Sequence, residues 1–217
     1  MYCSLCHDNE RPSSNSELKP YARDNVRAYY HCDNCDLVSA ANDSLLSPEQ
    51  EKLQYDQHRN NPDDLGYRTF LSRTLEPLLE RVNLEAKGLD FGCGPGPTIS
   101  VMAKEAGIEV SNYDPYYYPA PELLTKRYDF VTMTEVIEHI KQPMSALLLL
   151  DSLLKPKATL AIMTKRVIGQ AEFEHWHYKN DPTHIRFYSI KTFSWITERL
   201  NWQLEVINKD VVFFTKV

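Results

Sequence analysis

Short apolar runs and amphipathic stretches alternate along the chain from about residue 87 onward. A helical pattern at 98–107 separates the first two runs, and another at 144–155 precedes the last. Strands that alternate with helices predict parallel β-α-β units, so residues 62–217 should form an α/β domain. The apolar runs that we interpret as strands lie at 88–91, 108–114, 130–133 and 158–164.

The C-terminal segment predicts a helix followed by a hairpin. Ser189 is a residue type that caps helices, and a helical pattern follows it over 190–200. Apolar residues then recur in 202–207 and 211–217, and the polar residues 208–210 separate the two runs. Such a polar interruption is typical of a turn, so we expect two paired strands.

Two segments led by proline predict helices upstream of this domain. Ser47 is a suitable N-cap before Pro48, and acidic residues occupy the first turn that follows. Asn61 and Pro62 repeat this arrangement before a longer helical pattern. Pro77 falls inside the second pattern and should kink or divide that helix.

Four of the five cysteines form two C-x-x-C pairs near the N-terminus. The first residues are polar and lack a signal peptide, so we do not expect disulfides. Two short turns of this kind can present four thiolates to one tetrahedral zinc ion, and such a closed site is structural. Reduced thiols without metal and a redox dithiol are the alternatives. The predicted zinc ligands are Cys3, Cys6, Cys32 and Cys35.

Composition and charge bound the class of protein. Hydrophobic residues make up 42% of the 217 residues, which is enough for a folded core. The formal net charge is -6, so non-specific attraction to nucleic acid or to anionic membranes is weak. The longest apolar run, 146–150, is far too short to cross a bilayer. We expect a cytoplasmic protein.

A glycine-rich turn between the first strand and first helix of the α/β domain indicates a ligand site. Gly92, Gly94 and Gly96 are three of only seven glycines, and they allow a ligand to approach a helix N-terminus. Asp114 ends the next strand, where an acid can bind ribose hydroxyls. Pro97 stands where a dinucleotide fingerprint requires glycine. This favours an adenosyl ligand without a pyrophosphate.

The segments LDFGCGPGP, NYDPY and RYDFVTMTEVIEHI resemble, in this order, motifs of the class I S-adenosylmethionine-dependent methyltransferases. The resemblance implies a Rossmann-like, seven-stranded, mostly parallel sheet with helices on both faces. The expected units are a zinc-ribbon-like domain (1–44), a helical connector (45–61) and a methyltransferase domain (62–217). A Rossmann-like domain with another nucleotide, or with none, is the alternative. The resemblance implies cofactor binding by Asp90, Gly92, Cys93, Gly94, Gly96, Asp114, Thr134 and Glu135.

The irregular stretch 172–189 follows the last of these apolar strands and is rich in histidine and aromatic residues. Ligands of doubly wound sheets lie beyond the carboxyl ends of the strands, so this insertion should cover the substrate. His175, His177, His184 or Asp181 could take a proton from the acceptor, and the candidates that we favour are His177 and His184, together with His139. The alternative is a structural loop that packs on the sheet. The residues expected to wall an apolar pocket are Trp176, Tyr178, Phe187 and Tyr188.

The string EVIEH suggests a second metal site. Glu135, Glu138 and His139 would share one face of a helix, and they could bind Mg²⁺ or Mn²⁺ with a fourth ligand from His184 or His177. Small-RNA 2′-O-methyltransferases and ubiquinone-pathway O-methyltransferases have a similar E-x-x-E-H, which is associated there with a divalent metal. Alternatively, these side chains only brace their loop.

Three hypotheses on function follow from these motifs. The first is methyl transfer to a small molecule, at oxygen or nitrogen. The second is an RNA methyltransferase whose zinc ribbon grips RNA, and the third is a non-catalytic zinc-ribbon interaction protein. The string TEVIEH stands where amino-directed DNA methyltransferases have D/N-P-P-Y/F, and no Pro-Cys pair exists for cytosine-C5 chemistry. We therefore expect a small-molecule partner rather than nucleic acid.

Overall fold

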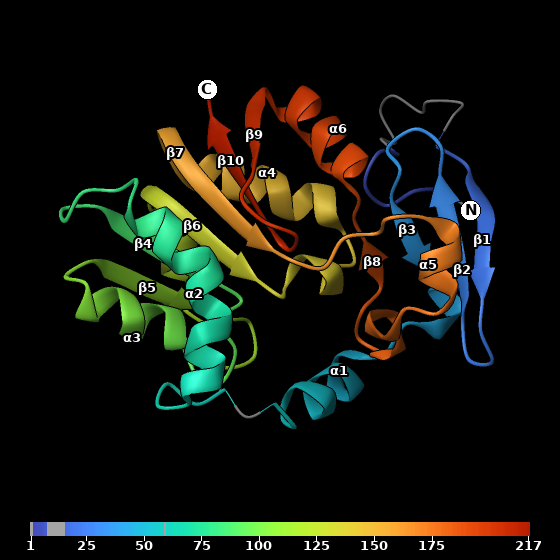
Figure 1. Ribbon diagram of the computed structural model, residues 1–217, viewed down its shortest axis with the longest axis horizontal. Helices are drawn as coiled ribbons and strands as arrows, with labels where there is room; N and C mark the ends of the chain where they lie inside the picture. The colour runs from blue at the N-terminus through green and yellow to red at the C-terminus, as the bar shows by residue number, and fades with distance from the viewer. Residues whose placement is uncertain (1, 8–15, 59) are drawn as a thin grey trace.

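The computed structural model describes residues 2–7, 16–58 and 60–217, and it contains two sheets (Figure 1). The larger sheet has the order β5-β4-β6-β7-β10-β9. Its first four strands are parallel, and β10 is antiparallel to both of its neighbours, which confirms the C-terminal hairpin. The strands are β4 (Lys87–Phe91), β5 (Glu109–Tyr113), β6 (Tyr128–Thr134), β7 (Leu154–Met163), β9 (Trp202–Val206) and β10 (Val211–Lys216).

The described residues give this sheet six strands, not the seven that the family resemblance implied. The segment 114–127, between β5 and β6, holds a turn in which Asp114 pairs with Tyr118 and the 3₁₀ helix η2 (Pro121–Thr125). A further parallel strand needs its own crossover of about a dozen residues. The segment 114–127 is too short to supply both the strand and the crossover.

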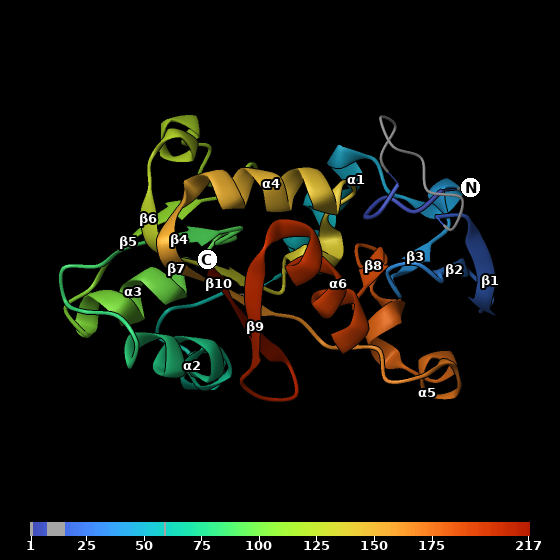
Figure 2. The same ribbon diagram turned by 90° about the horizontal axis from the view of Figure 1, so that it is seen from above.

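Helices cover both faces of the six-stranded sheet, as expected (Figure 2). On β6, Phe130 packs with one pair of helices, while Val131 and Met133 pack with the other pair. This alternation follows from the period of two along a strand. The helices are α2 (Leu65–Leu79) and α3 (Thr98–Glu105) on one face, and α4 (Pro143–Leu153) and α6 (Ile190–Leu200) on the other.

Helix α2 differs from its prediction at its start and at Pro77. Asp64, not Asn61, is its N-cap and accepts a hydrogen bond from the Tyr67 backbone N–H at 2.7 Å. The helix is not divided at Pro77. A proline leaves the carbonyl four residues earlier without its helical partner. Here that carbonyl belongs to Arg73, and it accepts a hydrogen bond from the Asn208 side chain at 3.3 Å, which lets the helix continue.

The N-terminal residues form a second, antiparallel sheet of four strands, β1-β2-β3-β8. Strand β8 comes from the insertion 172–189 and pairs with β3, with Val38 opposite Phe187. The N-terminal unit therefore shares a sheet with the segment predicted as the methyltransferase domain. The strands are β1 (Leu18–Arg23), β2 (Ala28–Cys32), β3 (Val38–Ala40) and β8 (Arg186–Phe187).

The aromatic residues of the insertion are used for packing rather than for a substrate pocket. Phe187, Tyr178 and Trp176 pack in the cluster that joins the insertion to the N-terminal sheet, and Tyr188 is buried in the main core. None of these four side chains lines the cavity described below. The expectation that they wall the pocket is wrong, because the N-terminal sheet needs an apolar partner for its inner face.

Short helices complete the fold. Helix α1 (Pro48–Tyr55) begins as predicted, because the Ser47 side chain accepts from the Gln50 N–H and Gln50 reaches back to the Ser47 N–H. The α6 helix likewise begins at the predicted cap, Ser189. Among the described residues, no helix is long and apolar enough to span a bilayer. The remaining short elements are η1 (Asn42–Ser44), η3 (Ile137–His139), α5 (Gln170–Glu174) and η4 (His177–Asn180).

Candidate functional site

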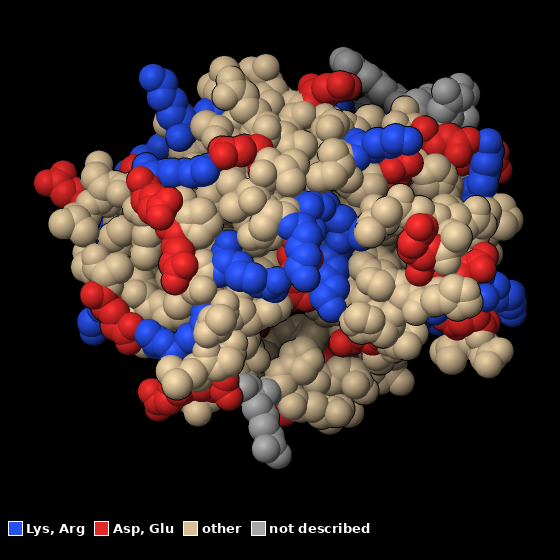
Figure 3. Space-filling model, in the orientation of Figure 1, with Lys and Arg blue, Asp and Glu red and all other residues tan. Residues whose placement is uncertain are grey.

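A cavity of about 590 Å³ lies at the carboxyl ends of β4, β5 and β6. Helices α1 and α2 contribute walls to it, as does the insertion 172–189. Figure 3 shows the molecule hollowed on one face, below a group of Lys and Arg side chains. The predicted residues that line the cavity are Asp90, Gly92, Cys93, Gly94, Asp114, Thr134, Glu135, His139 and His184.

The glycine turn after β4 is shaped by close approaches of backbone and side chains. Gly92 has φ +79°, and a Cβ there would meet Val136 at 2.6 Å, so only glycine fits without strain. A Cβ on Gly96 would lie 1.7 Å from the Asn60 carbonyl oxygen. Gly96 is thus covered by the α1–α2 linker and does not line the cavity. Sequence patterns gave no sign of Asn60.

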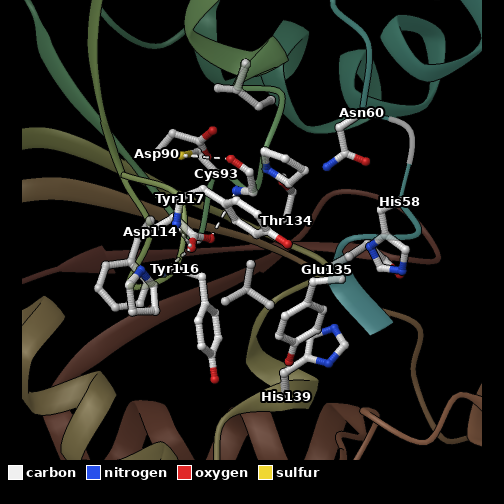
Figure 4. A pocket seen from close by; sticks show the side chains of 18 of the residues that line it. His58, Asn60, Asp90, Cys93, Asp114, Tyr116, Tyr117, Thr134, Glu135 and His139 are labelled. Atoms are coloured by element: carbon white, nitrogen blue, oxygen red, sulfur yellow. Dashed lines mark hydrogen bonds between the residues drawn. The ribbon is translucent and has the colours of Figure 1, made fainter. Parts of the chain in front are cut away.

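Asp114 organises the turn that follows β5 (Figure 4). Its carboxylate accepts hydrogen bonds from the backbone N–H groups of Gly94 at 3.1 Å, Tyr116 at 2.8 Å and Tyr117 at 3.1 Å. A carboxylate has about four acceptor positions, so one more bond can be accepted from a ligand. The predicted ribose-binding acid therefore lies at the cavity. Its hydrogen bond with Gly94 also joins the turn after β5 to the glycine turn.

Asp90 is a buried acid at the end of β4. Only 2% of its surface is exposed, and its side chain accepts a hydrogen bond from the Thr132 hydroxyl at 2.8 Å. Burial raises the pKa of Asp90 to about 7. A cationic ligand group beside this carboxyl would compensate its charge and return the pKa toward its usual range.

The EVIEH segment does not form the α-helix that the i, i+3, i+4 spacing predicted. Glu135 has φ +52°, a left-handed conformation that is costly for a residue with a side chain, and its N–H bonds the Met163 carbonyl at 2.8 Å. Glu138 and His139 follow on the 3₁₀ helix η3. Glu138 and His139 approach one another, while Glu135 turns toward Tyr178.

Tyr178 links the two glutamates. Its hydroxyl lies 3.0 Å from Glu135 Oε2 and also contacts Glu138 Oε1. One hydroxyl has one hydrogen, so the second contact needs a proton from a carboxyl group. Burial raises the pKa of Glu135 to about 8 and that of Glu138 to about 7, which favours such a shared proton. The other oxygen of Glu138, Oε2, is buried without a hydrogen-bond partner.

Two imidazoles meet edge-on beside Glu138, with ring centroids 4.8 Å apart. His139 Nδ1 lies 3.0 Å from the Thr183 carbonyl oxygen, and His184 Nδ1 lies 2.7 Å from the Tyr178 carbonyl oxygen. These carbonyls can only accept, so each Nδ1 carries the hydrogen and each Nε2 keeps a free lone pair. Burial lowers both pKa values, that of His184 to about 4, so both rings are neutral near pH 7.

The potential ligand atoms of Glu138, His139 and His184 all lie within 4.8 Å of one another. His139 and His184 were predicted from the sequence, and the fold brings them together. His177 lies elsewhere: it is exposed, it lies 3.2 Å from Lys165 Nζ, and it does not line the cavity. The geometry therefore favours two of the three predicted catalytic histidines.

Helix α1 supplies a wall that the sequence did not reveal. The ring of Tyr55 meets His139 edge-on at 5.4 Å, and Glu51 accepts a hydrogen bond from the Tyr116 hydroxyl at 3.1 Å. Glu51 also forms an ion pair with Lys141 at 2.8 Å. No residue of α1 is buried, and its sequence has no apolar stripe at helical spacing that would indicate packing over a cavity.

The four paired cysteines converge at the end of the N-terminal sheet. Sγ distances are 3.5 Å between Cys3 and Cys35 and 3.4 Å between Cys6 and Cys32, and all four sulfurs lie within 4.8 Å of one another. Tetrahedral zinc–sulfur bonds of about 2.3 Å place sulfurs about 3.8 Å apart. The cluster has the size and ligand type that zinc requires. Cys93 lies apart, buried in the glycine turn, where burial raises its pKa.

Comparison with known proteins gives one family and several structural neighbours. The model of a methyltransferase domain family matches residues 57–206. No curated protein matches the sequence.

Two of the similar solved structures align at a TM-score of 0.50. One is 1,6-didemethyltoxoflavin-N1-methyltransferase from Burkholderia thailandensis, with bound 1,6-didemethyltoxoflavin and S-adenosylhomocysteine; it is 16% identical, over 92% of this chain and 99% of that one. The other is CalO1, a methyltransferase in calicheamicin biosynthesis in its S-adenosylhomocysteine-bound form; it is 10% identical, over 78% of this chain and 58% of that one. At such identities the likeness shows the fold.

Proposed function

The chain belongs to this methyltransferase domain family and is an S-adenosylmethionine-dependent methyltransferase, and we propose that it methylates a hydroxyl oxygen of a small molecule. The observation that carries the proposal is the pair of neutral imidazoles, His139 and His184, beside the buried carboxyl of Glu138. A hydroxyl is a poor nucleophile until it loses its proton, so an acceptor oxygen needs such groups.

The residues at the glycine turn fit the cofactor. S-adenosylmethionine supplies a reactive methyl group on a sulfonium when bound. Asp90, whose burial raises its pKa, is suited to pair with the ammonium of the methionine part. Asp114 has an acceptor position left for the ribose, and the Gly92–Gly94 turn leaves room for the ligand. We propose Thr134 and Glu135 at the sulfonium side, because both line the cavity beyond the turn.

Replacing Asp114 with alanine should weaken binding of S-adenosylhomocysteine by about 1–3 kcal/mol, which is roughly 5- to 150-fold in Kd. The variant loses the ribose contact and the bond to the Gly94 N–H. Calorimetry on protein with an unchanged circular dichroism spectrum measures this. Glu122→Ala, an exposed acid in the same connection, is the control. An unchanged Kd for Asp114→Ala would contradict the assignment.

His139 and His184 can take the acceptor proton because their Nε2 lone pairs are free. The backbone carbonyls of Thr183 and Tyr178 hold the hydrogens on Nδ1, and they would stabilise the imidazolium after proton transfer. The Tyr55 ring against His139 limits the entry of water. These residues therefore bind the acceptor end, orient it and receive its proton.

Alternatively, the same cluster holds a divalent cation, and the imidazoles then bind the ion instead of taking the acceptor proton. Glu138 Oε2 is buried without a partner, and the two free Nε2 atoms complete a set of three ligands. Each histidine is oriented by a carbonyl at its other nitrogen, as in metal sites of proteins. A bound ion would lower the pKa of an acceptor hydroxyl. Glu135, in contact with Tyr178, would orient Glu138 through that hydroxyl.

If the cluster holds a cation, removal of divalent metal should lower methyl transfer about 10-fold or more, and Mn²⁺ or Mg²⁺ should restore it. The chelator must leave in place the zinc that we predict at the four cysteines, and elemental analysis verifies this. Glu138→Gln should abolish Mn²⁺ binding measured by calorimetry. If activity survives chelation while zinc is retained, the imidazoles act as bases without a metal.

The charge of the N-terminal residues favours a small acceptor over RNA. Residues 1–44, proposed above as an RNA grip, carry seven acidic and four basic side chains, whereas RNA binding needs a basic surface. The cavity is also enclosed by aromatic side chains of α1 and α2, Tyr55, Tyr67 and Phe70. Such walls suit a small, partly apolar molecule. The neighbour with bound 1,6-didemethyltoxoflavin is an example of a small acceptor in this fold.

Radiolabelled cofactor tests this choice directly. The protein is incubated with labelled S-adenosylmethionine and a cell extract, divided into a small-molecule fraction and an RNA fraction. We expect base-stable label in the small-molecule fraction, insensitive to RNase, as an ether is formed. Label that enters RNA and is released by RNase would support the RNA hypothesis instead.

A further inference from the structure

Arg27 is a buried cation in the N-terminal sheet, far along the chain from the catalytic cluster. Only 5% of its surface is exposed. It stands just before β2, in a turn where its N–H donates to Asp24 Oδ1 at 2.7 Å. A buried guanidinium must satisfy all its N–H groups, because each unpaired one costs free energy.

The guanidinium binds the backbone of one loop. Nη1 donates to the carbonyls of Pro182 at 3.2 Å and His184 at 3.1 Å. Nη2 donates to the carbonyl of Asp181 at 2.8 Å and contacts that of Lys179. Nε donates to the Tyr29 hydroxyl at 3.1 Å, so all five N–H groups are used.

Four carbonyl oxygens that point toward one place repel each other unless a cation lies between them. We therefore expect the loop 178–184 to depend on the guanidinium for this shape. Among the described residues, no carboxylate accepts a hydrogen bond from the Arg27 guanidinium, so its main partner is the loop itself. A lysine in its place cannot reproduce the planar arrangement of donors.

The other carbonyls of the same loop face the imidazoles. The Tyr178 carbonyl holds His184 Nδ1, and the Thr183 carbonyl holds His139 Nδ1. Carbonyls 179, 181, 182 and 184 face Arg27, so the loop lies between the cation and the two histidines. A shift of the loop would move both rings and release their Nδ1 hydrogens.

We propose that Arg27 is a positioning residue for methyl transfer, which fixes the loop 178–184 so that His139 and His184 point their Nε2 atoms at the acceptor. The N-terminal sheet then supports the acceptor site from behind this loop. The pairing of β3 with β8 and the bond from the Ala40 N–H to the Ile185 carbonyl at 3.0 Å continue the same attachment. The proposal rests on the proposed roles of the two histidines.

Arg27→Ala tests the proposal, with Arg23→Ala as the matched control. Arg23 is an exposed arginine at the end of β1 in the same sheet. In Arg27→Ala we expect deuterium exchange of the amides at 178–185 to accelerate at least 10-fold. Binding of S-adenosylhomocysteine should change less than 2-fold, since Asp90 and Asp114 lie on the other sheet. Arg23→Ala should leave both measurements unchanged.

Initial rates of methyl transfer to the small-molecule extract give the second readout. Misplacement of a reacting group by about 1 Å can lower the rate of a reaction about 100-fold. At a saturating concentration of the extract, the rate of methyl transfer should therefore fall roughly 10- to 100-fold. Millimolar guanidinium chloride should restore part of the rate in Arg27→Ala, because the ion can refill the space. A loss of rate that came only from general unfolding of the protein would not be restored by the ion.

The two measurements separate the possible failures. Unchanged exchange at 178–185 in folded Arg27→Ala overturns the proposal, whatever the activity. Faster exchange with an unchanged methyl-transfer rate also overturns it. If hydroxyl methylation itself is not found, the exchange result still decides whether Arg27 holds the loop. Should Arg27→Ala fail to fold, Arg27→Lys keeps the charge and stem, and the same exchange and rate changes are expected.

Discussion

Replacing His184 with alanine should reduce methyl transfer by about 10²- to 10⁴-fold, with little change in cofactor affinity. Burial lowers the pKa of His184 to about 4, so the ring is neutral and available as a base or as a metal ligand near pH 7. The Tyr178 carbonyl holds its Nδ1, which leaves Nε2 for the reaction. Either role is lost in the alanine variant, so the large effect does not depend on the choice between them.

Steady-state transfer of label to the small-molecule extract measures the loss, and calorimetry with S-adenosylhomocysteine measures the affinity. His175→Ala is a matched control, because His175 lies in the same insertion, is exposed and does not line the cavity. A His184→Ala variant with full activity would mean that the insertion is only a cover. The catalytic role of the His139–His184 pair would then be wrong.

Protein purified without added metal should contain about one zinc ion per chain, and loss of this ion should unfold the N-terminal sheet. Structural zinc in small sites has an apparent binding free energy of about 10–16 kcal/mol, as large as the stability of a whole domain. The ligand cysteines lie at the start of the chain and at the end of β2.

Elemental analysis gives the zinc content, and deuterium exchange of β1, β2 and β3 gives the folding. Cys32→Ser should lose zinc and protection together, while Cys93→Ser should keep the zinc, because Cys93 lies in the glycine turn. Since Arg27 belongs to this sheet, Cys32→Ser should also lose methyl transfer but retain cofactor binding. Metal-free protein with protected amides in β1–β3 would contradict the zinc assignment.

The candidate cofactor residues could be predicted because they are local in sequence. Gly92 and Gly94 need positive φ within one strand-turn-helix unit, and Asp114 ends the adjacent strand. Parallel neighbours bring their carboxyl ends together without any further information. The same locality explains why the caps at Ser47 and Ser189 and the C-terminal hairpin were predicted correctly.

The acceptor side could not be predicted in the same way. The spacing of Glu135, Glu138 and His139 suggested an α-helix, but the Met163 carbonyl on the neighbouring strand holds Glu135 in a left-handed conformation. The aromatic residues of the insertion suggested a pocket wall, whereas they fill the interface with the N-terminal sheet. In both cases a contact with another element overrode the local pattern.

The sequence by itself determined the order of the strands and helices that form the six-stranded sheet, the glycine turn, the acid after the second strand and the two cysteine pairs. Each of these depends on backbone conformation, periodicity or ligand spacing within a few residues. Only the tertiary structure decided that His184, rather than His177, meets His139, and that Arg27 binds the carbonyl of a residue 157 positions away. Such contacts arise from the pairing of β3 with β8 and from the need of a buried cation for acceptors. Neither the pairing of these strands nor the burial of this cation leaves a periodic signal in the sequence.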